Sequence, residues 1–298
     1  MADKANAYEI VAQTIIKALE SGDVAPWRKP WVSLGYKAKS LSSRKEYKGT
    51  NSWLLAVSAM SNGYSSPWWG TYKQITEMGG LVRKGEKGTP VVLYKQFEKE
   101  TESGDTKKFA VMRYFTVFCA EQADWEEGKA PAYEVPTART EVEVNSYAES
   151  LINGYFDRNP ELEFRFGGDR AYYSPAQDLV NLPKRETFSG DAEFYSTFFH
   201  ELGHSTGHKS RLNREGVVEH HYFGSELYSE EELVAELTAA FLSGETGILP
   251  STVNNSTAYI KSWLKVLKDD PKMVIKAASR AQKAADLIIG TPTEEVVE

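Results

Sequence analysis

The chain has 298 residues, of which 41% are hydrophobic, 12% aromatic and 26% charged. This composition excludes an intrinsically disordered or collagen-like chain, and the length suits two domains of ordinary size. No apolar run reaches the roughly 18 residues of a membrane span, and the N-terminus lacks the pattern of a secretory signal. The single cysteine, Cys119, excludes an internal disulfide framework and a cysteine-rich zinc site. We therefore expect a cytoplasmic protein.

Charge and histidine are distributed unevenly along the chain. The formal net charge is -7, but residues 26–95 hold 12 basic and 3 acidic residues, together with ten tryptophans and tyrosines. All five histidines lie between His200 and His221. The sequence therefore predicts a basic, aromatic surface in the first part of the chain and a histidine-containing site in the second.

Helix and strand patterns alternate in the first 125 residues. Apolar residues at helical spacing, ended by glycine, indicate helices, and β-branched and aromatic runs after Gly and Pro indicate strands. We expect helices over 4–20, 51–61 and 72–78, the last capped by Thr71, and a hairpin of strands within 81–98 and 109–118 joined by a polar loop.

A segment with two prolines, a glycine and mixed charge, residues 124–140, indicates a domain boundary. We place a linker at 126–140, between a domain of residues 1–125 and one of residues 141–298. The second domain is predicted to hold helices over 141–156, 190–206, 229–243, 255–268 and 271–289, and a bent hairpin over 164–183. The predicted fold class is α+β, with an N-terminal α+β domain and a mainly helical C-terminal domain that contains a small sheet.

The most informative motif is His200-Glu201-Leu202-Gly203-His204 within the predicted helix 190–206. Histidines at positions i and i+4 project from one helical face and can bind one divalent ion, for which Zn²⁺ is the expected metal. Glu201 lies near that face, where it can take a proton from metal-bound water, as in metallopeptidases. The alternative is a pair of surface histidines with a solvated glutamate, which the preceding apolar run does not favour.

A catalytic zinc site needs a third protein ligand. His208 continues the histidine series, although Gly207 is expected to end the helix first. The metzincin pattern requires a histidine at position 210, which is a serine. The helix over 229–243 offers Glu232 and Glu236, one turn apart on one face.

The acidic helix resembles that of the gluzincin peptidases, which carry Glu-x-x-(Ala/Ser)-acid on their second helix. The resemblance implies that Glu232 is the ligand and that Glu236 orients a histidine. Two alternatives remain open: Glu232 could form a capping box with Ser229, and Glu236 could replace it as the ligand. Residues 171–173 could form an edge strand that pairs with a peptide substrate, or an ordinary hairpin.

Aromatic and basic side chains are interleaved over residues 26–95. Aromatic rings stack on exposed bases while Lys and Arg contact phosphates, so this mixture favours single-stranded nucleic acid. The alternative is that the tryptophans are core residues and the lysines ordinary surface. The candidate DNA-binding residues are Trp27, Arg44, Lys45, Tyr47, Trp68, Trp69, Lys73, Arg83, Lys84 and Lys87.

The chain as a whole resembles the ArdC-type antirestriction proteins of conjugative plasmids. In the first part the resemblance rests on Tyr47-Lys48-Gly49-Thr50-Asn51, Trp69-Gly70-Thr71-Tyr72-Lys73-Gln74 and Val82-Arg83-Lys84-Gly85-Glu86-Lys87-Gly88. In the second part it rests on the histidine motif, on Thr206-Gly207-His208, and on Glu231-Glu232-Leu233-Val234-Ala235-Glu236.

The resemblance implies a single-stranded-DNA-binding domain followed by a zincin-like metallopeptidase domain with an unidentified protein or peptide substrate. It also implies that the protein protects incoming plasmid DNA from host restriction enzymes. Tyr259, which the resemblance includes, is a candidate for donating a hydrogen bond to the oxyanion, and the alternative is a packed structural tyrosine. The alternative is a non-enzymatic DNA-binding protein whose metal site is structural or vestigial.

Overall fold

The computed structural model describes residues 16, 20, 37–100, 106–133, 141–219, 226–248, 268–270 and 273–291. They fall into two compact units, one containing residues 37–133 and the other residues 141–291. Most of the predicted helix 4–20 and of the predicted helix 255–268 lies outside the described residues. No helix within the described ranges is both long and apolar enough to cross a membrane.

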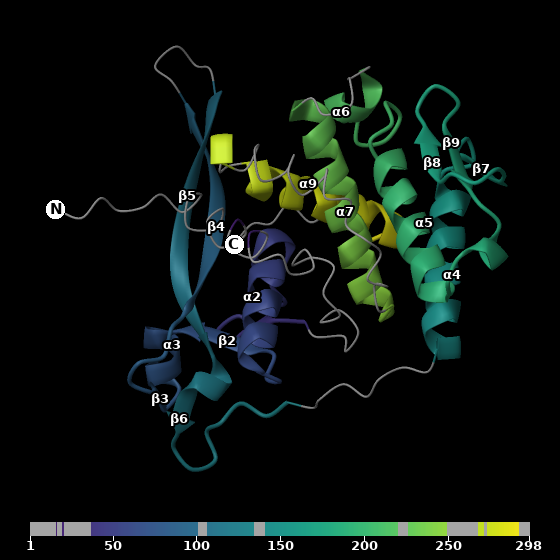
Figure 1. Cartoon of the computed structure of the whole chain (residues 1–298). Helices are drawn as coiled ribbons and strands as arrows, with labels where there is room; N and C mark the ends of the chain where they lie inside the picture. The colour runs from purple at the N-terminus through teal and green to yellow at the C-terminus, as the bar shows by residue number, and fades with distance from the viewer. Residues whose placement is uncertain are drawn as a thin grey trace. The chain divides into compact units, whose positions relative to one another are not determined.

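A four-stranded sheet organises the first unit (Figure 1). Its strand order is β1(Lys39–Ser40), β2(Trp68–Thr71), β5(Thr106–Cys119) and β4(Thr89–Glu100), with β1 parallel to β2 and the other pairs antiparallel. The β4–β5 hairpin confirms the predicted pair of strands. Its register runs from Thr89 opposite Val117 to Glu100 opposite Thr106, so the hairpin is continuous over the whole of β4.

Two helices and a two-stranded sheet make up the rest of the first unit as far as its residues are described. The helices are α2(Gly49–Asn62) and α3(Tyr72–Glu77), and the short 3-10 helix η3(Ala120–Gln122) precedes β6(Ala123–Trp125), which pairs antiparallel with β3(Gly80–Val82). The predicted cap is confirmed, because the Thr71 hydroxyl accepts from the Gln74 amide while the Gln74 side chain accepts from the Thr71 amide.

The first half of the predicted linker is held on the first unit. Trp68 donates its indole N–H to the carbonyl of Ala132 at 2.9 Å, and the Tyr133 hydroxyl donates to Glu121 at 2.8 Å. Residues 134–140 lie outside the described residues.

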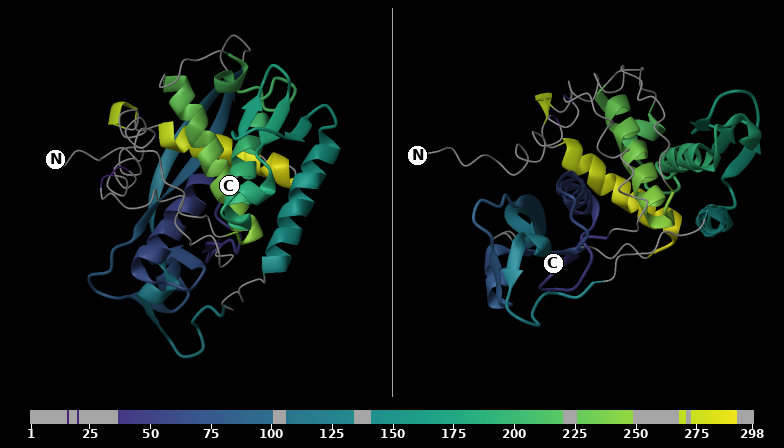
Figure 2. Two further views of the ribbon diagram at one scale, coloured as in Figure 1. Left: turned by 45° about the vertical axis from the view of Figure 1, so that its right-hand side comes forward. Right: turned by 60° about the horizontal axis from the view of Figure 1, so that its bottom comes forward.

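The second unit is mainly helical and carries a small sheet, as predicted. Over the described residues its helices are α4(Glu141–Arg158), α5(Asp191–Ser205), the short α6(Glu215–Val218), α7(Glu226–Thr246) and α9(Met273–Ile289), with the 3-10 helix η4(Arg185–Thr187) before α5. α5 packs against α7 and also contacts the small sheet (Figure 2). Aromatic residues of α5, including Phe194, Tyr195, Phe198 and Phe199, are buried in the core of this unit.

The small sheet differs from the predicted bent hairpin. Its order is β7(Glu163–Phe166), β9(Leu179–Leu182) and β8(Tyr172–Ser174), so only β8 and β9 form a hairpin while β7 pairs parallel with β9 on the other side. All four residues of β9 are buried, which explains why this strand takes the centre. Because β8 is an edge strand, residues 172–174 lie where the sequence places a possible peptide-pairing edge.

Gly203 lets α5 and α7 approach closely. A Cβ atom at this position would lie 3.2 Å from Ala235 Cα and 3.2 Å from Thr238 Cβ. The glycine inside the histidine motif therefore brings the histidines of α5 against the acidic residues of α7.

Candidate metal centre

Three side chains from α5 and α7 meet at one point. His200 Nε2 lies 3.1 Å from His204 Nε2, and the carboxylate oxygens of Glu232 lie 3.7 Å from His200 Nε2 and 3.5 Å from His204 Nε2. These residues form the one group of three or more His, Cys, Asp or Glu side chains with metal-ligand spacing in the described part of the chain. All three side chains are largely buried.

The spacing of the three groups fits a tetrahedral divalent ion. Two donor atoms that each lie about 2.0–2.1 Å from such an ion are separated by roughly 3.3 Å. The observed separations of 3.1, 3.5 and 3.7 Å lie on either side of that value. Two imidazoles and one carboxylate are also the donor set of one class of catalytic zinc site. The residues present therefore fit the metal that the motif implies.

Glu232 is an ionised carboxylate rather than a helix cap. Burial acts to raise the pKa of Glu232, but His204 and His200 hold that pKa at about 2. The capping-box alternative is wrong, because α7 already begins at Glu226 and Ser229 lies inside the helix. Glu232 is therefore available to bind a cation.

Each histidine has a second carboxylate beside its other ring nitrogen. Glu236 Oε1 lies 3.7 Å from His200 Nδ1, and Glu231 Oε1 lies 3.2 Å from His204 Nδ1. Burial acts to lower the pKa of His204, but the hydrogen bonds to Glu231 and Glu232 raise it well above its ordinary value. Carboxylates in these positions fix the orientation of a metal-binding imidazole.

Glu231 is itself clamped by a buried arginine. Arg214 Nε donates to Glu231 Oε2 at 2.9 Å, and a second guanidinium nitrogen donates to Glu231 Oε1 at 2.6 Å. The same guanidinium bonds Thr206 Oγ1 at 2.7 Å and the carbonyl oxygen of Gly203 at 2.8 Å. Arg214 thus connects the end of α5 to α7 directly behind His204. The sequence patterns assigned no role at the site to Glu231 or Arg214.

Glu201, which lies between the two histidines in the sequence, is a largely buried residue. The residue is 8% exposed, and within the described ranges its side chain makes no hydrogen bond or ion pair. A carboxylate that is not engaged by a structural partner can accept a proton from a neighbouring water.

His208 lies outside the group that has metal-ligand spacing. α5 ends at Ser205, and His208 Nδ1 lies 2.8 Å from Ser210 Oγ and 3.6 Å from Asp178 Oδ2. Tyr259 and Trp27 lie outside the described residues.

The candidate DNA-binding residues have different environments. Trp69 is completely buried and packs edge-on against Tyr64, so its selection as a DNA contact is wrong. Trp68 is half-buried beneath the Arg44 guanidinium, which lies 4.8 Å from the ring centroid. Tyr47 is half-buried, and its burial raises the pKa of its hydroxyl.

The charged candidates are all exposed, and two of them form ion pairs. Lys73 lies 3.6 Å from Glu77, and Arg83 lies 3.0 Å from Glu86 and 3.5 Å from Asp124. The remaining cations in the set, Lys45, Lys84 and Lys87, are exposed.

Comparison with known proteins identifies the family of the chain. Residues 5–118 match the N-terminal domain of the anti-restriction factor ArdC, and residues 154–280 match a zincin-like metallopeptidase family. The metal-free crystal structure of the antirestriction protein ArdC from plasmid R388 is similar, with a TM-score of 0.70 and 37% identity over 94% of this chain and 96% of that one. The chain belongs to the ArdC family. The Mn(II)-bound structure of the R388 protein is also similar, with a TM-score of 0.72 and 35% identity over 95% of this chain and 97% of that one.

Curated relatives of this ArdC family member include proteins of different length. Two DNA primases TraC of Escherichia coli are 35% and 36% identical to it over 100% and 98% of this chain, which spans only 21% and 28% of their length. The uncharacterised protein y4eC of Sinorhizobium fredii is 32% identical over 94% of this chain and 90% of its own length.

The Arg214–Glu231 pair gives a testable expectation for metal binding in this ArdC family member. Glu231→Gln weakens the acceptor beside His204 and leaves the three proposed ligands in place. We expect about 10- to 100-fold weaker binding of Zn²⁺ or Mn²⁺, the usual cost of losing an orienting partner. Isothermal titration of the metal-free protein measures this affinity.

Glu230→Gln is the matched control, because the neighbouring Glu230 pairs with Arg280 instead. Equal metal affinity in the Glu231→Gln and Glu230→Gln variants would show that Glu231 does not position His204.

Proposed function

We propose that the second unit is a metal-dependent peptidase, with His200, His204 and Glu232 as ligands of a divalent ion and Glu201 as the general base. The observation that carries this proposal is the convergence of three donor atoms from α5 and α7, with Glu201 following the ligand His200 directly in sequence. The bound ion would supply Lewis-acid polarisation of water and of the peptide carbonyl. Glu201 accepts the proton of the attacking water and can return it to the leaving amine.

The orienting carboxylates hold the site before substrate arrives. Glu231, fixed by Arg214, sets the ring of His204, and Glu236 lies beside the ring of His200. Such preorganisation supports a catalytic role, because the ligands need little rearrangement. Zn²⁺ is the ion that the two-histidine, one-carboxylate set favours, and Mn²⁺ is supported by the R388 relative.

We also propose that the first unit binds single-stranded DNA with little sequence preference. Its support is the excess of cations and aromatic rings over residues 26–95 and the similarity to two DNA primases. Together the two activities support an antirestriction protein that acts in the cytoplasm and shields incoming plasmid DNA. The R388 relative is named an antirestriction protein. The rival is a non-enzymatic binding protein, whose structural metal site would need no general base such as Glu201.

The DNA-binding proposal predicts a clear preference for single strands. The full-length protein should bind a fluorescein-labelled 20-nucleotide oligo-dT at least about tenfold more tightly than a duplex of equal length, because duplex bases are not available for stacking. Raising the salt concentration should weaken binding, since lysine and arginine displace condensed counterions. Fluorescence anisotropy measures both effects, and equal affinity for duplex and single strand would contradict the proposal.

A further inference from the structure

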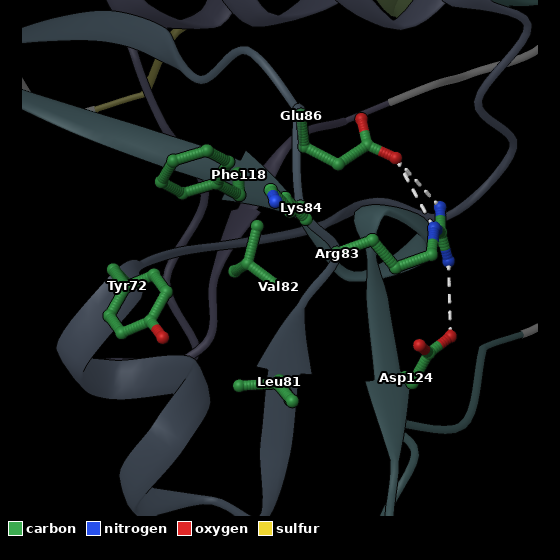
Figure 3. Close-up of a pocket in the computed structure, with 8 residues that line it drawn as sticks. All are labelled: Tyr72, Leu81, Val82, Arg83, Lys84, Glu86, Phe118 and Asp124. Atoms are coloured by element: carbon green, nitrogen blue, oxygen red, sulfur yellow. Dashed lines mark hydrogen bonds and ion pairs between the residues drawn. The ribbon is translucent and has the colours of Figure 1, made fainter.

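An open groove of about 580 Å³ lies on the first unit, where α3, β3 and β5 meet (Figure 3). Tyr72 begins α3, Leu81 and Val82 belong to β3, and Phe118 lies near the end of β5. Arg83 and Lys84 follow β3 directly along the chain. The groove therefore combines four apolar or aromatic side chains with two basic and two acidic ones, the acids being Glu86 and Asp124.

The apolar part of the groove is exposed and rigidly supported. Tyr72 is 50% exposed and Leu81 is 59% exposed, whereas Val82 and Phe118 pack against the buried cluster of Leu41, Ile75 and Ala123. The backbone of Tyr72 is also held, because Tyr72 directly follows the N-cap Thr71, which forms a capping box with Gln74. An exposed ring on a fixed backbone loses little conformational entropy when a ligand stacks on it.

The charges of the groove are arranged so that one cation remains available. The Arg83 guanidinium forms ion pairs with Glu86 at 3.0 Å and Asp124 at 3.5 Å, and it donates a hydrogen bond to the carbonyl oxygen of Glu121 at 2.5 Å. Figure 3 shows these two acids gathered around Arg83, with Tyr72 and Phe118 on the other side of the groove. Lys84 makes no ion pair with any described residue and is exposed. An aromatic surface next to an unpaired ammonium is complementary to a base and its phosphate.

We propose that this groove is a base-stacking subsite for single-stranded DNA, in which a base stacks on the exposed ring of Tyr72 beside Leu81 and Lys84 contacts the adjoining phosphate. This inference rests on the single-stranded-DNA binding proposed above and assigns it to particular side chains. Tyr72 and Leu81 are new in this role. Arg83, by contrast, is part of the wall of the groove, because its guanidinium is already paired.

The test compares two ligands of the same length. The full-length protein, as wild type and as the Tyr72→Ala variant, is titrated with a 20-nucleotide oligo-dT and with a 20-unit abasic deoxyribose phosphate strand. We expect Tyr72→Ala to bind oligo-dT about tenfold more weakly and the abasic strand within twofold of wild type, since only the bases can stack. Lys84→Gln should weaken the binding of both ligands by a similar factor. It should also reduce the slope of log affinity against log salt concentration by about one.

Two further variants keep the result interpretable. Tyr72→Phe retains the ring and should restore oligo-dT binding, and Tyr114→Ala removes a ring that is 42% exposed on β5 but does not line the groove. If wild type does not bind oligo-dT at all, the proposed DNA binding fails, and with it this subsite. Two results with a wild type that binds oligo-dT would overturn the base-stacking subsite alone. One is that Tyr72→Ala binds oligo-dT as tightly as wild type, and the other is that its affinities for oligo-dT and for the abasic strand fall by the same factor.

Discussion

Replacing Glu201 with glutamine should lower peptide hydrolysis by about 100- to 10,000-fold while the divalent ion remains bound, because general-base catalysis typically contributes a factor of that size. Glutamine preserves the shape of the side chain but cannot accept the proton of the attacking water. The three proposed ligands, His200, His204 and Glu232, are untouched. The measurement is the initial rate on a substrate that the wild-type protein cleaves, together with the metal content of the variant.

A matched control separates the loss of a base from the loss of a charge. Glu186→Gln removes an exposed carboxylate from the same unit and should leave the rate unchanged. Full activity in Glu201→Gln would show that another group is the base, and loss of the ion would show that Glu201 supports metal binding instead.

The Glu201→Gln variant also distinguishes a peptidase from a non-enzymatic DNA-binding protein by how well each protects a plasmid. If antirestriction depends on hydrolysis, a plasmid that encodes the Glu201→Gln variant should enter a restricting host as poorly as a plasmid that lacks the gene. A non-enzymatic DNA-binding protein would protect the plasmid as well as wild type does.

Replacing Glu232 with glutamine should abolish stoichiometric metal binding, whereas Glu236→Gln should weaken binding by no more than about 100-fold. Glu232 is the carboxylate that faces Nε2 of both histidines, at 3.7 and 3.5 Å. Glu236 faces only Nδ1 of His200, at 3.7 Å. Losing a direct ligand removes a coordinate bond, and losing an orienting partner only loosens the geometry.

Metal content after dialysis and titration with Zn²⁺ compares these variants directly. His208→Ala should retain wild-type affinity, because that ring lies beside Ser210 and Asp178. A larger loss in Glu236→Gln than in Glu232→Gln would reverse the assignment of the third ligand.

The histidine pair was predictable from the sequence because its geometry is local. Spacing of i and i+4 puts both rings on one face of any helix. The proposed third ligand, Glu232, was also indicated by a local pattern, because Glu232 and Glu236 lie one turn apart on the same helix. Arg214 had none, because it reaches Glu231 from outside both helices, where sequence periodicity carries no information.

The environment of each aromatic residue was harder to predict. Trp68 and Trp69 are adjacent on one strand, so one must face each side of the sheet. With two identical residues the alternation pattern cannot show which one is buried, and the structure buries Trp69. The parallel pairing of β7 with β9 was missed for a similar reason, since it joins segments across the β8 hairpin.

The most direct test of the proposed metal centre is a crystal structure of the protein with Zn²⁺ or Mn²⁺, with anomalous diffraction locating the ion. We expect one ion within about 2.0–2.2 Å of His200 Nε2, His204 Nε2 and a Glu232 oxygen, with Glu201 close to an open coordination position. An ion coordinated by Glu236 or His208 in place of Glu232, or an ion elsewhere in the protein, would contradict the proposed centre.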